Sequence, residues 1–270
     1  MAPMDGIATS TPASTQAGDA GSPPTEAPSI MRSEDLSFSM DFQPVLDGRE
    51  GRVNTLYCRP TARLPDGRFL SDDVLLGAGL EGRTVNEALL IKMMLRTLEM
   101  ASVRAALMAK NNDARKIIIP VNGAGLAIPA VATAFAEGCR TFIRDLGPNI
   151  LFEATNMDDE KSMGYLDEVA ILLYPFCLTY AARILPKSQN LKLYATTNYT
   201  GIALHLRDKP WPMKAVGSYF DDLVRRSETN RLKAYCHGLG SVDLVEAALA
   251  AGVRFVSGPG VKGWVAKQAA

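Results

Sequence analysis

The clearest candidate for chemistry in this sequence is a histidine in a turn. His237 opens the segment His237-Gly-Leu-Gly240, which follows the short apolar stretch 233–236. A histidine at the end of a strand can act as a general base or as a metal ligand, but either role needs a partner. The nearest candidate in sequence, Cys236, should point to the opposite face of the strand. We therefore favour a hydrogen-bonded structural role for His237 over a catalytic one.

Other metal-binding and nucleophilic residue types are sparse. The chain of 270 residues has 4 cysteines and 2 histidines, and the widely spaced cysteines form no CxxC pair. This argues against a structural zinc site and predicts reduced, mostly buried thiols in a cytoplasmic protein. The 29 basic and 29 acidic residues give a formal net charge of zero. The composition therefore gives no excess of positive charge that would indicate binding to duplex nucleic acid or to an anionic membrane.

The turn that holds His237 is predicted to lie between a strand and a helix. Residues 233–236 form a buried strand, Ser241 caps the helix that follows, and Gly252 ends it. Residues 253–256 then form a second strand. Parallel strands require a crossover of this kind, so the segment is a βαβ unit. Folds of this class place their sites at the carboxyl ends of the strands, where His237 lies.

The remaining elements follow the same alternation after an initial hairpin. Residues 36–45 and 52–58 are predicted as antiparallel strands joined by a turn. Further strands are predicted at 116–121, 149–153, 191–195, 212–216, 233–236 and 253–256. Helices are predicted near 71–77, after the capping box Thr84-Val-Asn-Glu87, at 128–144 and at 219–226. This order predicts an α/β fold, a modified TIM-type (β/α)8 barrel with an antiparallel first strand.

Two stretches bear on domain organisation and membranes. Helical sequence at 161–185 is predicted to be bent or broken at Pro175. Its apolar part is slightly short for a membrane span, so we predict a buried core helix. Residues 1–30 are rich in Ala, Ser, Thr, Pro and Gly, without the basic start and apolar run of a signal peptide. We therefore predict a disordered N-terminal tail at 1–35 and a barrel domain at 36–270.

Short motifs at the strand ends resemble the EAL-domain family of cyclic di-GMP phosphodiesterases, over residues 36–265. Phe42-Gln-Pro-Val45 is similar to the family's YQPIV, Val121-Asn122 to the VN of SVNLS, and Leu151-Phe-Glu153 to the start of LEITE. Arg63-Leu-Pro-Asp-Gly67 with Ser71-Asp-Asp-Val74 resembles HPDG…SPxxF. The segment 235–259 follows AEGVET…LxxLGxxxxQGY in spacing as well as pattern. The order and separation of these motifs carry the resemblance.

The resemblance implies a metal site that this chain has largely lost. Active family members hold two Mg²⁺ or Mn²⁺ ions at the barrel mouth, and such ions need charged oxygen ligands. Asn122 and Glu153 keep the family's residues. Acidic family positions fall instead on Thr55, Thr196, Thr197, His237 and Gly240. One carboxylate and one amide cannot bridge two cations, so we predict no catalytic residues and no cofactor, with Mg²⁺ or Mn²⁺ bound only if catalysis is retained.

Gln43 and Arg59 match positions that contact the dinucleotide in binding members of the family, and Lys214 keeps the family's catalytic lysine, so these three residues are the candidates for ligand binding. An arginine could pair with a phosphate through two parallel hydrogen bonds, and a lysine could supply a point charge. The alternatives are structural. Gln43 would cap a strand end, Arg59 would pair on the surface with Asp66 or Asp72, and Lys214 would form an ion pair with Glu153 across the mouth.

The function predicted from these observations is that of a catalytically inactive EAL-like signalling protein. It would act through contacts with an unidentified regulatory protein in bacterial motility, biofilm formation or attachment, as the resemblance implies. A metal-independent cyclic di-GMP receptor is the alternative, and an active cyclic di-GMP phosphodiesterase is less favoured. No membrane span and no duplex nucleic acid partner are expected.

Overall fold

The structure is a computed structural model that describes residues 37–63, 65, 67, 69–70, 87–157, 162–186, 188, 190–206 and 211–268. Several sequence predictions lie outside these residues. They are the tail at 1–35, the helix near 71–77, the capping residue Thr84, and the surface carboxylates Asp66 and Asp72 that were considered as partners of Arg59.

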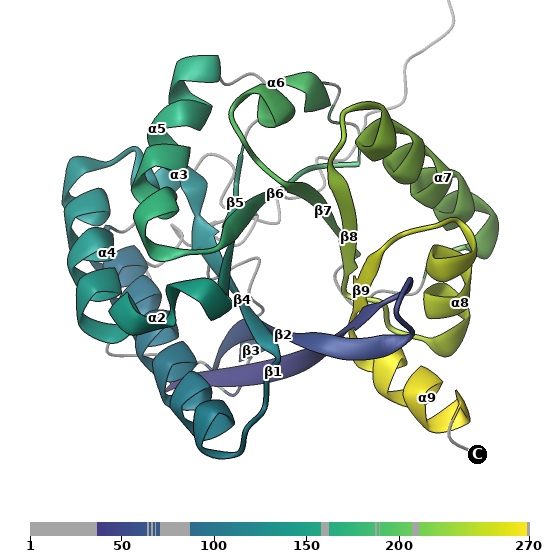
Figure 1. Cartoon of the computed structure of the whole chain (residues 1–270), viewed down its shortest axis with the longest axis horizontal. Helices are drawn as coiled ribbons and strands as arrows, with labels where there is room; N and C mark the ends of the chain where they lie inside the picture. Colours follow the sequence, from purple (N-terminus) through teal and green to yellow (C-terminus); the bar gives the residue numbers. More distant parts are fainter. Residues whose placement is uncertain are drawn as a thin grey trace, which may run out of the picture. The chain divides into compact units, whose positions relative to one another are not determined.

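The described strands form one sheet that closes into a barrel (Figure 1). Their bounds are β1 Ser37–Asp47, β2 Arg52–Arg63, β3 Phe69–Leu70, β4 Lys116–Asn122, β5 Ile150–Thr155, β6 Thr179–Arg183, β7 Gly201–His205, β8 Lys233–His237 and β9 Phe255–Ser257. Their order is β1-β9-β8-β7-β6-β5-β4-β2-β3, and the additional β1–β2 pairing closes the ring. Strand β1 is antiparallel to β2 and to β9, whereas the other neighbours around the ring are parallel. This confirms the predicted modified (β/α)8 barrel with an antiparallel first strand.

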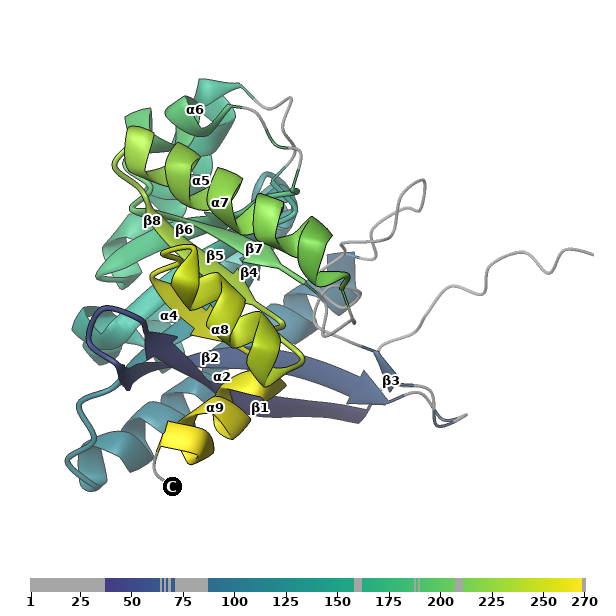
Figure 2. The same ribbon diagram turned by 90° about the vertical axis from the view of Figure 1, so that its right-hand side faces the viewer.

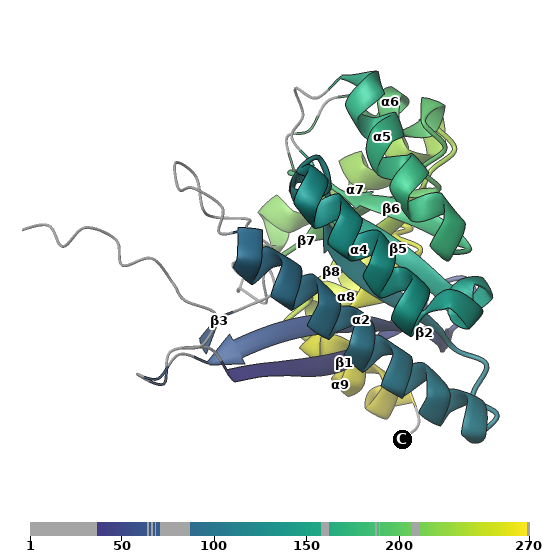
Figure 3. The same ribbon diagram turned by 90° about the vertical axis from the view of Figure 1, so that its left-hand side faces the viewer.

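Helices cover the outside of the barrel (Figure 1). Their bounds are α2 Glu87–Lys110, α3 Gly123–Leu126, α4 Pro129–Phe142, α5 Met163–Leu173, α6 Leu191–Thr196, α7 Met213–Thr229, α8 Val242–Ala250 and α9 Pro259–Gln268, with 3-10 turns η2 Arg144–Asn149 and η3 Tyr174–Phe176. Helices α7 and α8 pack side by side on one flank (Figure 2), and α2 and α4 on another (Figure 3). No helix in the described residues has the length and hydrophobicity that a membrane span requires.

Two cores follow from the alternation of side chains along the strands. Residues that face outward pack against the helices, as Phe152 and Ala154 of β5 do. Residues that face inward fill the barrel, and this inner core contains Val45, Tyr57, Ile118, Ala181, Ala203, Tyr235 and Phe255. Because successive side chains of a strand point to opposite faces, the face of every second residue can be inferred from its neighbours.

The predicted βαβ unit is present at the end of the chain. The hydroxyl of Ser241 accepts a hydrogen bond from the backbone N–H of Leu244 at 3.3 Å and so caps α8. Gly252, with φ of +89°, follows the helix in the left-handed conformation that glycine tolerates best. The predicted hairpin of β1 and β2 and the predicted helix that became α4 are also confirmed.

Two predicted strands are wrong, because residues 191–195 lie in α6 and residues 213–216 begin α7. The missing barrel strands are β6 at Thr179–Arg183 and β7 at Gly201–His205. The predicted core helix at 161–185 therefore ends at Leu173, and η3 with Pro175 separates it from β6. A helix and a buried strand joined by a short apolar turn form one apolar run in the sequence, and periodicity alone cannot show where the helix ends and the strand begins.

Candidate functional site

Glu153 is a buried carboxylate inside the barrel, close to the carboxyl ends of the parallel strands, which we call the mouth. It belongs to β5 and is 1% exposed. Its neighbours Phe152 and Ala154 face the outer core, whereas Leu151 packs against the inner core. Strand alternation therefore turns Glu153 inward. A charged group in this position requires partners, since burial without them would be very costly.

Arg183 at the end of β6 supplies one partner. Its Nε donates to Glu153 Oε1 at 2.7 Å, and a terminal guanidinium nitrogen lies 2.7 Å from the same oxygen. The guanidinium also donates to the hydroxyl of Tyr57 on β2. Arg183 is 8% exposed, so this ion pair lies almost entirely outside water.

His237 on β8 supplies the other partner. Its Nε2 lies 2.7 Å from Glu153 Oε2, and its Nδ1 lies 2.6 Å from the hydroxyl of Ser257 on β9. The imidazole stacks on the ring of Tyr57, with centroids 4.6 Å apart and an angle of 22° between the planes. The hydrogen bond predicted for His237 is therefore present. We call Tyr57, Glu153, Arg183, His237 and Ser257 the polar cluster.

The polar cluster holds Glu153 in its charged form. Burial by itself would raise the pKa of this carboxyl, but the charges of His237 and Arg183 and their hydrogen bonds lower it to about 2. The carboxylate is thus ionised at neutral pH, and both of its oxygens contact a nitrogen of another side chain.

The residues present do not fit the pair of divalent cations that the resemblance implies. Arg183 carries a permanent positive charge and contacts Glu153, the one carboxylate expected to remain among the metal ligands. A divalent cation bound to the same oxygens would lie close to that guanidinium and would be repelled by it. In the part of the chain that the structure describes, no His, Cys, Asp or Glu group of three or more is arranged to hold a metal.

Several predicted residues lie near the mouth but have local partners. The side-chain oxygen of Asn122, at the end of β4, accepts from the backbone N–H of Gly125 at 2.8 Å and caps α3. Gln43 is buried on β1 opposite Tyr57 and donates to Asp41 at 3.1 Å. Arg59 lies opposite Asp41 on β2, so Gln43 and Arg59 occupy successive inward-facing positions of the hairpin.

Other predicted residues lie away from this cluster. Thr55 pairs with Lys116, the first residue of β4, and so lies toward the opposite end of the barrel. Thr196 and Thr197 lie at the end of α6 and donate to the carbonyls of Lys192 and Leu193. Two further positions, Lys214 in α7 and Gly240 after β8, are exposed.

The ion pair considered between Glu153 and Lys214 is wrong, because Glu153 pairs with Arg183 and His237 instead. The correspondences assigned to Thr196, Thr197 and Lys214 rested on strands that the structure shows as helices. Positions at the carboxyl ends of β6 and β7 are held instead by Arg183 and His205.

Sequence reasoning missed Tyr57, Arg183 and Ser257. A signal for Arg183 was available, since an arginine within a strongly apolar run needs a buried counter-charge or an exit to water. Once β6 is recognised as a strand, its alternation places Ala181 and Arg183 on the same inward face. Tyr57 and Ser257 give no comparable signal, because both residue types occur commonly on strands.

Comparisons with known proteins identify solved structures with a similar fold. No family model matches the sequence, and no curated protein does so. Among solved structures, the EAL enzyme Bd1971 in its cAMP- and cyclic-di-GMP-bound form has a TM-score of 0.61 at 12% sequence identity. The alignment covers 82% of this chain and 60% of the Bd1971 chain. The FimX EAL domain from Pseudomonas aeruginosa bound to cyclic di-GMP has a TM-score of 0.58 at 15% identity, covering 82% and 88%. The PaMucR phosphodiesterase in complex with cyclic di-GMP has a TM-score of 0.59 at 12% identity, covering 82% and 93%.

The match to Bd1971 is partial, since this chain spans 61% of the length of its cGMP-bound form and 60% of the form just described. At such low identity the likeness concerns the path of the backbone. It includes the closed barrel with helices outside and the first strand running against its neighbours. The chain therefore has the fold of the EAL domains.

Proposed function

We propose that this protein is a catalytically inactive EAL-type signalling protein that acts in bacterial regulation through contacts with another protein. Motility, biofilm formation and attachment are the processes in which such a regulator would act. The fold shared with EAL domains supports the signalling class, since the solved structures include domains bound to cyclic di-GMP.

The observation that carries the proposal is the ion pair between Arg183 and Glu153. Two-metal hydrolysis of a phosphodiester needs carboxylates that are free to hold the cations and to neutralise charge. Here the buried carboxylate is already neutralised by a guanidinium and contacts an imidazole. At an effective dielectric constant of 20, two unit charges 4 Å apart interact by about 4 kcal/mol. A divalent cation would therefore face a repulsion from Arg183 that is large compared with the binding energy of a weak metal site.

A metal-independent receptor for cyclic di-GMP is the second candidate. It is favoured by the placement of Gln43 and Arg59 on successive inward-facing positions of the β1–β2 hairpin, from which both could contact one ligand. The guanidinium of Arg59 suits a phosphate in a way that requires no metal. Lys214 lies on α7, and its part in such a site stays a prediction.

Turnover and binding are separated by two measurements on the whole chain. With Mn²⁺ or Mg²⁺ present, we expect no linear dinucleotide product from cyclic di-GMP by chromatography. Product that disappears in Glu153→Ala would overturn the inactive assignment. Calorimetric titration with cyclic di-GMP in the presence of a chelator tests the receptor. A micromolar or tighter Kd that weakens in Arg59→Ala, but not in the control Lys262→Ala, would replace the protein-contact proposal with the receptor.

The protein-contact role has its own test. The whole chain would be cross-linked in lysate of the source bacterium, and captured proteins would be compared with those captured by a heat-unfolded sample. We expect one partner that re-forms a complex with the purified chain and does not require cyclic di-GMP. Failure of every captured protein to re-form such a complex would contradict the proposal.

A further inference from the structure

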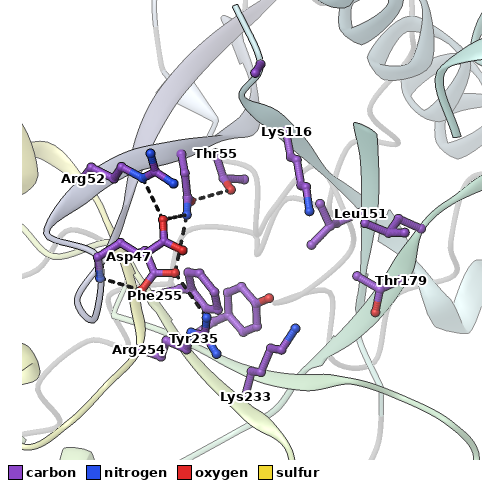
Figure 4. Close-up of a pocket in the computed structure, with 14 residues that line it drawn as sticks. Asp47, Arg52, Thr55, Lys116, Leu151, Thr179, Lys233, Tyr235, Arg254 and Phe255 are labelled. Atoms are coloured by element: carbon purple, nitrogen blue, oxygen red, sulfur yellow. Dashed lines mark hydrogen bonds and ion pairs between the residues drawn. The ribbon is translucent and has the colours of Figure 1, made fainter. Parts of the chain in front are cut away.

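A pocket of about 330 Å³ opens at the amino ends of the parallel strands, at the opposite end of the barrel from the mouth. Figure 4 shows its lining, which comes from the first residues of several strands and from the β1–β2 turn. Its volume lies at the lower end of the range of roughly 300–1,000 Å³ that is usual for small-molecule sites. None of the polar cluster residues lines it.

The acidic groups of this pocket already have partners. Asp47 Oδ2 accepts from Asn54 and from Arg254, each at 3.4 Å, and its Oδ1 accepts from the backbone N–H of Arg49 at 3.0 Å. Glu50 accepts from Arg52 at 2.7 Å. The two carboxylates of the lining are thus balanced in number by its two arginines, and the two lysines of the lining are in excess.

Two lysines in the lining are not matched in this way. Lys116 begins β4 and Lys233 begins β8, and both side chains extend into the pocket (Figure 4). Within the described residues, neither ammonium group has a hydrogen bond or an ion pair. Burial and the nearby positive charges of Arg254 and Lys116 lower the pKa of Lys233. Several positive charges therefore lie around one cavity, and a bound anion would reduce the repulsion between them.

The floor of the pocket is aromatic and carries a further donor. Tyr235 is 4% exposed, and its ring stacks on Phe255 with centroids 4.6 Å apart. Its hydroxyl points into the pocket (Figure 4) and has no hydrogen-bond partner among the described residues. The hydroxyl lies in the lining of the pocket, where it is available to a ligand. Leu151 and Leu178 add an apolar wall.

We propose that this pocket binds a small phosphate monoester that carries a flat ring. The phosphate would accept from Lys116, Lys233 and the hydroxyl of Tyr235, and the ring would pack against Leu151 and Leu178. A phosphate monoester carries about −1.5 to −2 charge at neutral pH, which matches two unpaired ammonium groups better than a single carboxylate does. The site is independent of the function proposed above, because it shares no residue with the polar cluster or with Gln43 and Arg59.

Phenyl phosphate is a suitable probe. The ¹⁵N-labelled chain would be titrated with phenyl phosphate at constant ionic strength, and backbone amide shifts would be followed by NMR. We expect saturable changes at the amino ends of β4, β8 and β9. Replacing Lys116→Gln or Lys233→Gln should raise the Kd about tenfold each, which corresponds to about 1.4 kcal/mol. The exposed Lys262→Gln serves as the matched control and should bind as the unmodified chain does, whereas Tyr235→Phe should weaken binding severalfold.

Comparison ligands separate charge from shape. Inorganic phosphate should bind more weakly than phenyl phosphate, since it lacks the ring, and benzoate more weakly still, since it carries a single charge. The proposal is overturned if phenyl phosphate gives no saturable shifts, if it binds the Lys116→Gln/Lys233→Gln double variant unchanged, or if benzoate binds equally well. These substitutions lie at the surface of the pocket, and a thermal unfolding scan checks that each variant is folded.

Discussion

Replacement of Glu153 by glutamine tests the account of the polar cluster most directly. Glutamine keeps the shape of the side chain but removes its charge, so that Arg183 stays buried without its counter-ion. We expect Glu153→Gln to lower the free energy of unfolding at pH 7 by about 3–5 kcal/mol, the usual cost of breaking a buried ion pair from one side.

The pKa of Glu153 gives an independent magnitude. The folded protein lowers this pKa from 4.5 to about 2, and a difference of that size corresponds to about 3 kcal/mol of stability at neutral pH. Because the folded-state pKa is the lower one, the stabilisation is fully present above pH 4.5 and is lost as the pH falls to about 2. The difference between the unmodified chain and Glu153→Gln should therefore shrink over the same range of pH.

Urea unfolding followed by tryptophan fluorescence, repeated from pH 7 down to pH 2, measures both effects. Glu137→Gln is the matched control, since Glu137 is exposed on α4, and it should change stability by less than about 0.5 kcal/mol. Adding Arg183→Met to Glu153→Gln removes both charges and should recover part of the loss. If Glu153→Gln is as stable as the unmodified chain at pH 7, or if its deficit is the same at pH 2, the reasoning is refuted.

Two further predictions concern single atoms in the barrel. Ser257→Ala removes the hydroxyl 2.6 Å from His237 Nδ1 and should cost about 1–3 kcal/mol in urea unfolding, because a buried nitrogen loses its partner; an unchanged midpoint would contradict this contact. Gly258→Ala should cost more than about 2 kcal/mol, because φ is +137° and the added carbon would meet Leu239 N at 2.4 Å. Gly217→Ala is its control, since nothing lies within 4 Å of the added carbon in α7, and it should stabilise by up to about 1 kcal/mol; similar effects of the two substitutions would exclude the steric explanation.

The fold class could be predicted from the sequence because local signals define the first and the last elements of the chain. The hairpin of β1 and β2 is set by a turn, and the βαβ unit is set by Ser241 and Gly252, whose conformations depend on neighbours in sequence. The middle of the chain is different. Leu191 and Tyr194 are buried at helical spacing in α6, but the stretch also alternates as a strand would, and only packing decides between them.

The polar cluster could be predicted only in part for the same reason. Glu153 and His237 lie at strand ends that the sequence places correctly, so both were identified as residues near the mouth. Their contact depends on the closure of the barrel, which brings β5 and β8 to face each other across its interior. Arg183 could be identified as a partner only if residues 179–183 were recognised as strand β6. The sequence prediction placed these residues in a helix, so Arg183 was not considered. Local sequence patterns thus showed that Glu153 and His237 lie near the mouth, but they did not show which side chains these residues contact.

The reversed direction of β1 also decides where the chain enters the barrel. Ser37 pairs with Arg63, the last residue of β2, and β2 runs parallel to β4. The chain therefore begins its first strand at the mouth, whereas a first strand parallel to the others would begin at the far end, beside the pocket that Lys116 and Lys233 line. A tether, a fluorophore or a fused domain attached just before Ser37 would thus be delivered to the end of the barrel where Glu153 lies. The strand topology alone decides at which end of the barrel such a group would lie, so the result does not depend on the sequence that precedes Ser37.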